Sequence, residues 1–170
     1  MFERTVLGVD PGTGAVGLAV VAGTAGRPDV RWTTTVRTDA ADPLAHRLRQ
    51  IARAVRAAIV EHRPESLAIE RLIWNTNVGS AMDVARASGA IMAAAAEASV
   101  DVEEYAPLEV KMAVTGVGNA SKEQVRRGLG LLLGPSKVPA QPDAADAVAV
   151  AYCHLQQSKL RRLTREAGRR

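Results

Sequence analysis

The order of the expected secondary-structure elements limits the possible folds of this chain more than any other feature. Three strands come first, and helices then alternate with strands. The first strands are short apolar or β-branched runs, separated by turns that contain glycine or proline, at residues 5–10, 15–22 and 29–37. Such neighbouring strands predict an antiparallel meander. With the later strands at 66–70 and 102–106, the order predicts an α/β fold with a mixed five-stranded sheet and helices on both faces.

The helices are expected between and after these later strands. Residues 42–62 repeat apolar side chains at spacings of three and four, and their opposite face is rich in arginine. Residues 77–98 are crowded with Ala, Gly and Ser, which allows another backbone to approach closely. Two short helices are expected at 107–115 and 121–133, and a last helix begins near Pro142, a residue favoured in a first helical turn.

Length and charge predict one domain with a basic tail. The chain has 170 residues, of which 47% are hydrophobic, enough for one sizeable core but not for two. Residues 159–170 hold six of the 22 basic residues and one of the 18 acidic ones, so the rest has 16 basic and 17 acidic residues. We therefore expect a single domain over 1–158 and a tail over 159–170, either disordered or extending the last helix. Any nucleic-acid surface on this nearly neutral domain must come from local placement of Lys and Arg.

Cysteine content and hydropathy indicate the cellular compartment of the protein. The single cysteine, Cys153, cannot form an internal disulfide, and no Cys or His spacing suggests a zinc site. No leader sequence opens the chain, and the most apolar run, residues 89–96, is too short to span a membrane. The sequence therefore predicts a cytoplasmic protein without a membrane segment.

Four acidic residues are the candidate functional site. Asp10 and Glu70 each end an apolar strand, where ligands gather in open α/β sheets, and Asp143 and Asp146 share one face of a helix start. Two carboxylates about 5 Å apart repel by roughly 3 kcal/mol at an effective dielectric near 20, so four that converge require protonation or a cation. Oxygen ligands alone favour Mg²⁺, with Mn²⁺ second, and two such ions are usual in phosphodiester hydrolysis.

Each acid also has a simpler interpretation. Asp10 followed by Pro11 and Gly12 could start a turn, and Glu70 could be an exposed strand end. Asp143 and Asp146 could serve only to stabilise the start of a helix. The residues by themselves therefore do not establish that the four acids meet.

Around these acids, the sequence resembles the RuvC family of Holliday junction resolvases, which have a ribonuclease H-like fold. The resemblance covers residues 5–156 and is most specific in its last two segments. The matching segments are LGVDPG at 7–12, AIE at 68–70, EVKMAVTGVGNASKEQV at 109–125 and PDAADAVAVA at 142–151.

The resemblance implies a homodimer that binds a four-way DNA junction and nicks two strands of like polarity symmetrically. It also implies collaboration with the branch-migration proteins RuvA and RuvB, and it makes the helix at 77–98 the candidate dimer contact. In the family's motifs the positions of Asp10, Glu70, Asp143 and Asp146 are catalytic acids that bind Mg²⁺. The positions of Lys111 and Lys122 are DNA contacts, and here both lie beside glycine-containing turns.

One segment departs from the family's pattern. The family commonly has a base-stacking aromatic residue three positions after the strand-ending Glu, where this chain has Ile73 followed by Trp74. We hypothesise that Trp74, with Asn75 and Asn77 on the same loop, contacts DNA and stacks on a base. The alternative is that Trp74 covers the local core.

Three other functions compete with a resolvase. The YqgF-like nucleases of the same superfamily share a DPGT-type opening, but they are not expected to contain the segment around Lys111. An actin-like ATP-binding protein needs two such domains and about twice this length. A module that binds junctions without cutting them does not need all four acids.

Overall fold

Five strands form one twisted sheet at the centre of the molecule. The computed structural model describes residues 4–72 and 78–167, and the strand order in the sheet is β3-β2-β1-β4-β5. β1 pairs antiparallel with β2, and β2 with β3, whereas β1–β4 and β4–β5 are parallel pairs. The strands are β1 (Arg4–Asp10), β2 (Ala15–Thr24), β3 (Arg27–Arg37), β4 (Ser66–Glu70) and β5 (Asp101–Tyr105).

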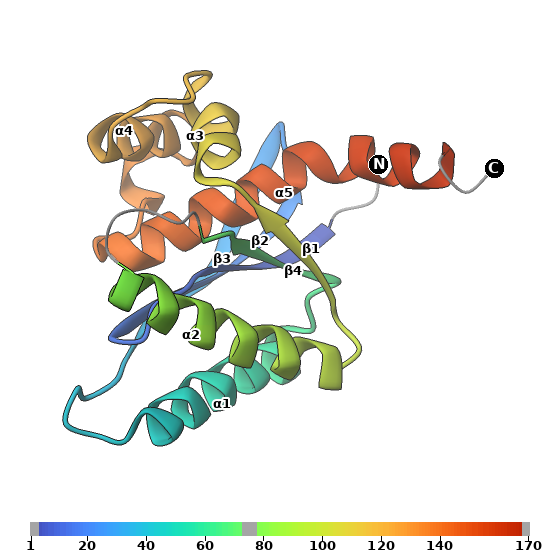
Figure 1. The fold of residues 1–170 in the computed structure, drawn as a ribbon. Helices are drawn as coiled ribbons and strands as arrows, with labels where there is room; N and C mark the ends of the chain where they lie inside the picture. Colours follow the sequence, from blue (N-terminus) through green and yellow to red (C-terminus); the bar gives the residue numbers. More distant parts are fainter. Residues whose placement is uncertain (1–3, 73–77, 168–170) are drawn as a thin grey trace.

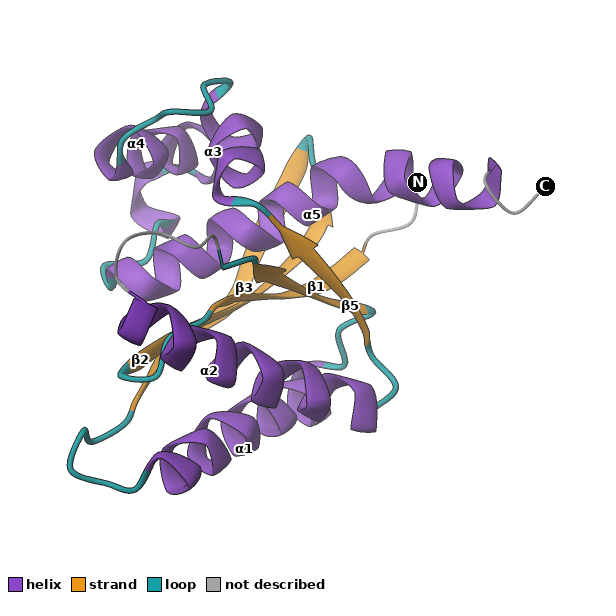
Figure 2. Ribbon diagram, viewed as in Figure 1, coloured by secondary structure: helices purple, strands orange, loops and turns teal. Residues whose placement is uncertain are grey.

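Helices cover both faces of this sheet. α1 and α2 pack on one face, and α5 crosses the other face with α3 and α4 beside it (Figure 1; Figure 2). The mixed five-stranded sheet expected from the sequence is confirmed. The helices are α1 (Leu44–His62), α2 (Val78–Glu97), α3 (Pro107–Thr115), α4 (Lys122–Leu133), the 3₁₀ turn η1 (Pro135–Lys137) and α5 (Pro142–Ala167).

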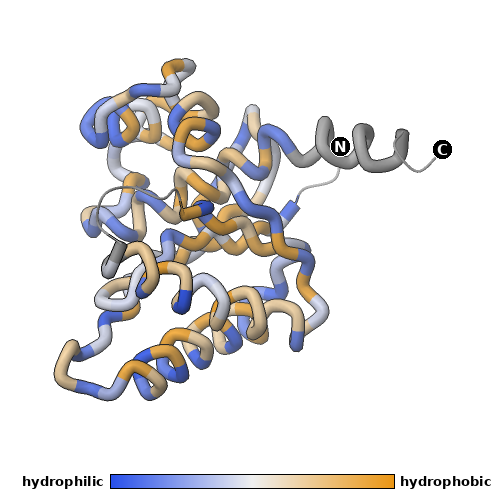
Figure 3. Tube along the Cα trace, in the orientation of Figure 1, coloured by the Kyte–Doolittle hydropathy of each residue, from blue (hydrophilic) through white to orange (hydrophobic). Residues whose placement is uncertain are grey.

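The pleat of β1 divides its side chains between two hydrophobic cores. Val6 belongs to the core under α5, whereas Leu7 and Val9 belong to the core under α1 and α2. Successive strand residues point to opposite faces, and here both faces are covered, so the strand reads as continuously apolar. Figure 3 shows the resulting concentration of hydrophobic residues in the central strands.

The element boundaries differ from those expected mainly where turns are tight. β2 and β3 extend to a short hairpin at Ala25 and Gly26, beyond the expected strand limits. α5 continues through Ala167 without a break, so the basic tail extends the last helix through that residue. Within residues 4–72 and 78–167, no helix combines the length and apolar character needed to cross a bilayer.

Candidate active site

The C-terminal ends of two central strands place the first two acids. β1 ends at Asp10 and β4 ends at Glu70, and because these strands are adjacent and parallel, both acids lie at the same edge of the sheet. Both side chains are partly buried. The polar strand ends predicted from the sequence therefore do face one region of the molecule.

Two glycines bring the helix acids to this edge. A Cβ at Gly8 of β1 would collide with the carbonyl oxygen of Ala147, and one at Gly17 of β2 would collide with that of Asp143. Only residues without a side chain allow α5 to lie this close to the sheet. The backbone of α5 thereby carries Asp143 and Asp146 to the ends of β1 and β4.

The pKa values of the strand acids show that the four acids share one electrostatic environment. Burial, followed by the charges of Asp146, Glu70 and Asp143, raises the pKa of Asp10 to about 7. Burial and then the charge of Asp146 raise the pKa of Glu70 as well. The structure therefore places the other three acids close enough to Asp10 to repel its charge, which the sequence could not establish.

Lys111 and Lys122, the two lysines that the resemblance marks as DNA contacts, lie beside this acidic group. Lys122 at the start of α4 donates a hydrogen bond to Asp146 across 3.1 Å, and this bond raises the pKa of Lys122. Lys111 on α3 and Lys122 both lower the pKa of Glu70. A hollow of about 260 Å³ contains three of the acids and both lysines, and it is lined by Asp10, Glu70, Pro107, Val110, Lys111, Lys122, Val125, Asp146 and Ala149.

Asp143 lies outside the lining of this hollow. Its carboxylate is 4.0 Å from the guanidinium of Arg37, which ends β3 at the same edge of the sheet as Asp10. Arg37 was not among the site residues predicted from the sequence. Its position as the last residue of a strand, like Asp10 and Glu70, is the signal that could have identified it.

A second group of residues, which was not predicted from the sequence, stabilises the turn that follows Asp10. The Thr38 hydroxyl donates to the carbonyl oxygen of Thr13 and accepts a hydrogen bond from Arg47 Nε at 2.9 Å. The Thr38 backbone N–H donates to Gly14 O at 3.1 Å. The Arg-rich face of α1 therefore contributes one arginine to the support of the active-site turn.

The donor set suits a hard divalent cation. The acids offer only carboxylate oxygens, and because burial and neighbouring carboxylates raise the pKa of Asp10, a bound cation would favour its ionised form. Among the described residues, however, no three Asp, Glu, His or Cys side chains lie close enough together to form a ready-made ion site. With Lys122 bound to Asp146, the ammonium group supplies part of the positive charge that the acids require.

The remaining sequence candidates lie elsewhere. Trp74, Asn75 and Asn77, together with Ile73, fall outside the described residues. His154 is buried in the core, where its Nε2 and Nδ1 are each 2.9 Å from the hydroxyls of Ser66 and Tyr105. Cys153 is buried beside it.

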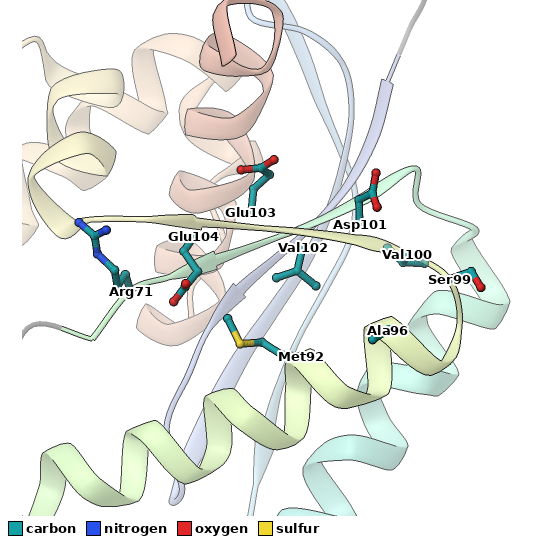
Figure 4. A pocket seen from close by; sticks show the side chains of 9 residues that line it. All are labelled: Arg71, Met92, Ala96, Ser99, Val100, Asp101, Val102, Glu103 and Glu104. Carbon is teal, nitrogen blue, oxygen red and sulfur yellow. The ribbon is translucent and has the colours of Figure 1, made fainter. Parts of the chain in front are cut away.

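A larger hollow lies away from the acids, between the end of α2 and the edge strand β5. Its volume is about 800 Å³, and Figure 4 shows the side chains around it, including Arg71, Asp101, Glu103 and Glu104. Glu103 and Glu104 project to opposite sides of β5. None of the site residues predicted from the sequence lines this hollow.

Comparison with known proteins identifies the family of this chain. The family model described as crossover junction endodeoxyribonuclease RuvC matches residues 6–154. Proteins of that name from Moorella thermoacetica and Salinispora arenicola are 42% and 43% identical to this chain, with matches that span 96% of this chain and 99% and 95% of theirs. The structure of T. thermophilus RuvC in complex with a Holliday junction substrate superposes with a TM-score of 0.87 at 34% identity, covering 92% of this chain and 96% of that one. The chain is therefore a member of the RuvC family of crossover junction endodeoxyribonucleases, with the ribonuclease H-like fold of that family.

Proposed function

We propose that this protein resolves four-way DNA junctions by metal-dependent hydrolysis of phosphodiester bonds at Asp10, Glu70, Asp143 and Asp146. The convergence of four acids on one sheet edge is the observation that supports this site most strongly. The substrate follows from family membership and from the T. thermophilus relative, whose structure contains a Holliday junction.

The acids and the lysines would have different roles at such a site. The four carboxylates would hold Mg²⁺, or Mn²⁺ in its place, and two ions are expected at one site. When bound, these ions activate the attacking water and stabilise the leaving oxygen. Lys122, whose side chain is 85% exposed in its pair with Asp146, can turn to a DNA phosphate, and Lys111 lines the same hollow as Asp10 and Glu70. Both lysines would position the DNA backbone without reading its sequence.

Symmetric nicking requires two such sites, and we propose that α2 forms the dimer contact. Its outward face carries small or apolar exposed side chains at helical spacing, namely Met82, Ala85, Gly89, Ala93 and Ala96. A face of this kind allows a second helix to approach closely. Cooperation with RuvA and RuvB stays a prediction from the family resemblance, as does DNA stacking by Trp74.

The test is cleavage of a synthetic mobile four-way junction by the purified protein with Mg²⁺ or with EDTA. We expect paired, symmetric nicks with Mg²⁺ alone, and Asp146→Asn should retain junction binding while losing cleavage. A binding module without nuclease activity would instead hold the junction intact in every condition, and that result would refute the proposal.

Metal binding has a readout independent of cleavage. Ions that bind only the folded protein at a free concentration c stabilise it by RT ln(1 + c/Kd), so its melting temperature rises with the logarithm of ion concentration above Kd. Mg²⁺ should therefore raise the melting temperature of the parent protein at pH 8, with a smaller rise in Asp146→Asn. Equal shifts in both proteins would show that this acid does not hold the ion.

A further inference from the structure

We propose that Arg37 is a phosphate-contacting residue that binds the DNA strand on the far side of the acids from Lys111. This inference rests on the proposed function, because it assigns a further contact to the same DNA-bound site. It starts from the ion pair between Arg37 and Asp143, which places a guanidinium at the β3 end of the active-site edge.

The backbone at Arg37 is fixed from three directions. Arg37 pairs with Ala15 in the sheet, and its carbonyl oxygen accepts a hydrogen bond from Gln50 Nε2 at 3.0 Å. The next residue, Thr38, is anchored to Thr13 and Gly14 in the turn after Asp10. The strand end is therefore rigid with respect to Asp10, while the Arg37 side chain is 68% exposed.

The pair with Asp143 does not explain why an arginine stands here. The two groups are 4.0 Å apart, at the outer limit of an ion pair, and an exposed pair of this kind contributes little to stability. The exposed guanidinium keeps its hydrogen-bond donors available to solvent. Arginine offers donors in a planar fork that matches a phosphate, which makes it well suited to a backbone contact.

The position of Arg37 completes a row of cations along the sheet edge. β3 and β4 are separated by β2 and β1, which at the usual strand spacing puts their ends about 14 Å apart. Lys111 and Lys122 act on Glu70 at the β4 side, whereas Arg37 reaches Asp143 at the β3 side. A DNA strand that crosses the acids would meet positive charge on both sides of them, and Arg37 is the contact on the β3 side.

The experiment measures binding of the same synthetic four-way junction in EDTA over a range of KCl concentrations. Arg37→Gln removes the charge, Arg37→Lys keeps the charge without the fork, and Arg31→Gln is the matched control. Arg31 is an exposed arginine near the middle of the same strand, and it pairs with Asp29 at 3.0 Å. All proteins are compared by circular dichroism to verify equal folding.

Arg37→Gln should lower junction affinity about tenfold at moderate salt. It should also reduce the slope of log affinity against log salt by about 0.9 for each junction strand that the residue contacts, because one fewer phosphate is neutralised there. Arg37→Lys should recover the slope but not the full affinity, and Arg31→Gln should match the parent. Unchanged affinity and slope in Arg37→Gln would overturn the proposal and leave Arg37 as a counter-charge for Asp143. Failure of the parent to bind the junction at all would instead refute the proposed function on which this inference rests.

Discussion

Asp10 lies in an electrostatic environment that disfavours its ionised form. Its burial at the end of β1, followed by the charges of three neighbouring carboxylates, raises its pKa to about 7. An acid in this position favours a proton or a cation over its free ionised form. The same side chain that is suited to hold a metal ion therefore destabilises the metal-free protein at neutral and alkaline pH.

Asp10→Asn should stabilise the metal-free protein more at pH 8 than at pH 5. The unfolded chain releases the Asp10 proton near pH 3.8 and the folded chain near pH 7, so stability falls as pH rises between these values. Two pH units separate pH 5 from the pKa of Asp10 in the folded protein. The gain in free energy of unfolding of Asp10→Asn over the parent should therefore grow by up to about 3 kcal/mol. Urea unfolding in EDTA at the two pH values measures it.

A suitable control is Asp42→Asn, which removes a carboxylate from an exposed loop before α1. It should show no growing advantage between pH 5 and pH 8. If the stability difference between Asp10→Asn and the parent stays constant over this range, Asp10 is not the group that titrates near neutrality.

At the scale of elements, the packing of α5 on the sheet decides whether the acids meet. Gly17 of β2 faces the backbone of Asp143, and any Cβ there would displace the start of the helix. A residue of the sheet, Gly17, therefore controls the position of the acids on α5. The sequence next to Asp143 and Asp146 does not reveal this requirement.

Gly17→Ala should lose both stability and nuclease activity. Overpacking of this kind typically costs about 1 to 3 kcal/mol, and the shift of α5 would separate Asp143 and Asp146 from Asp10. Urea unfolding measures the first effect, and single-turnover cleavage of the junction measures the second. Gly26→Ala is the control, because a Cβ at that hairpin position meets nothing within 4 Å. Parent-like cleavage by Gly17→Ala would show that the helix position is not critical.

The elements themselves were largely predictable. Apolar periodicity identified α1, and the short β-branched runs identified the strands, because both patterns arise from which face of an element is buried. The boundaries of β2 and β3 were less predictable, since a two-residue hairpin gave few turn residues to mark it. The loop that contains Trp74 lies outside the described residues, so its proposed role stays a prediction.

At the scale of the whole molecule, two nicks of like polarity imply two copies of the site. None of the exposed small residues on this face of α2 lines the hollow at the acids, so the proposed dimer contact and the acidic site do not share residues. Gly89 lies in the middle of this face, and a Cβ there meets nothing within 4 Å in the single chain. A large side chain at this position would therefore disturb a partner and not the fold.

Gly89→Arg should convert the proposed dimer into a monomer. The melting transition of the individual chain should not change, because the substitution does not disturb its fold. Sedimentation velocity measures the oligomeric state, and the mobile junction assay should show that symmetric paired nicks are lost. Val60→Arg places the same charge on an exposed position of α1 and should leave the dimer intact. If Gly89→Arg remains dimeric, the contact lies on another face.

Patterns along the chain were sufficient to predict the order of the elements, the strand ends that carry Asp10 and Glu70, and the sharing of one helix face by Asp143 and Asp146. These features are local, since they depend on periodicity and on spacing along one element. Packing between elements, in contrast, brings the other three acids close to Asp10, lets Lys122 bind Asp146, and places Arg37 beside Asp143. These relations join residues separated by up to 136 positions in the sequence, and they depend on how closely α5 packs on two glycines of the sheet.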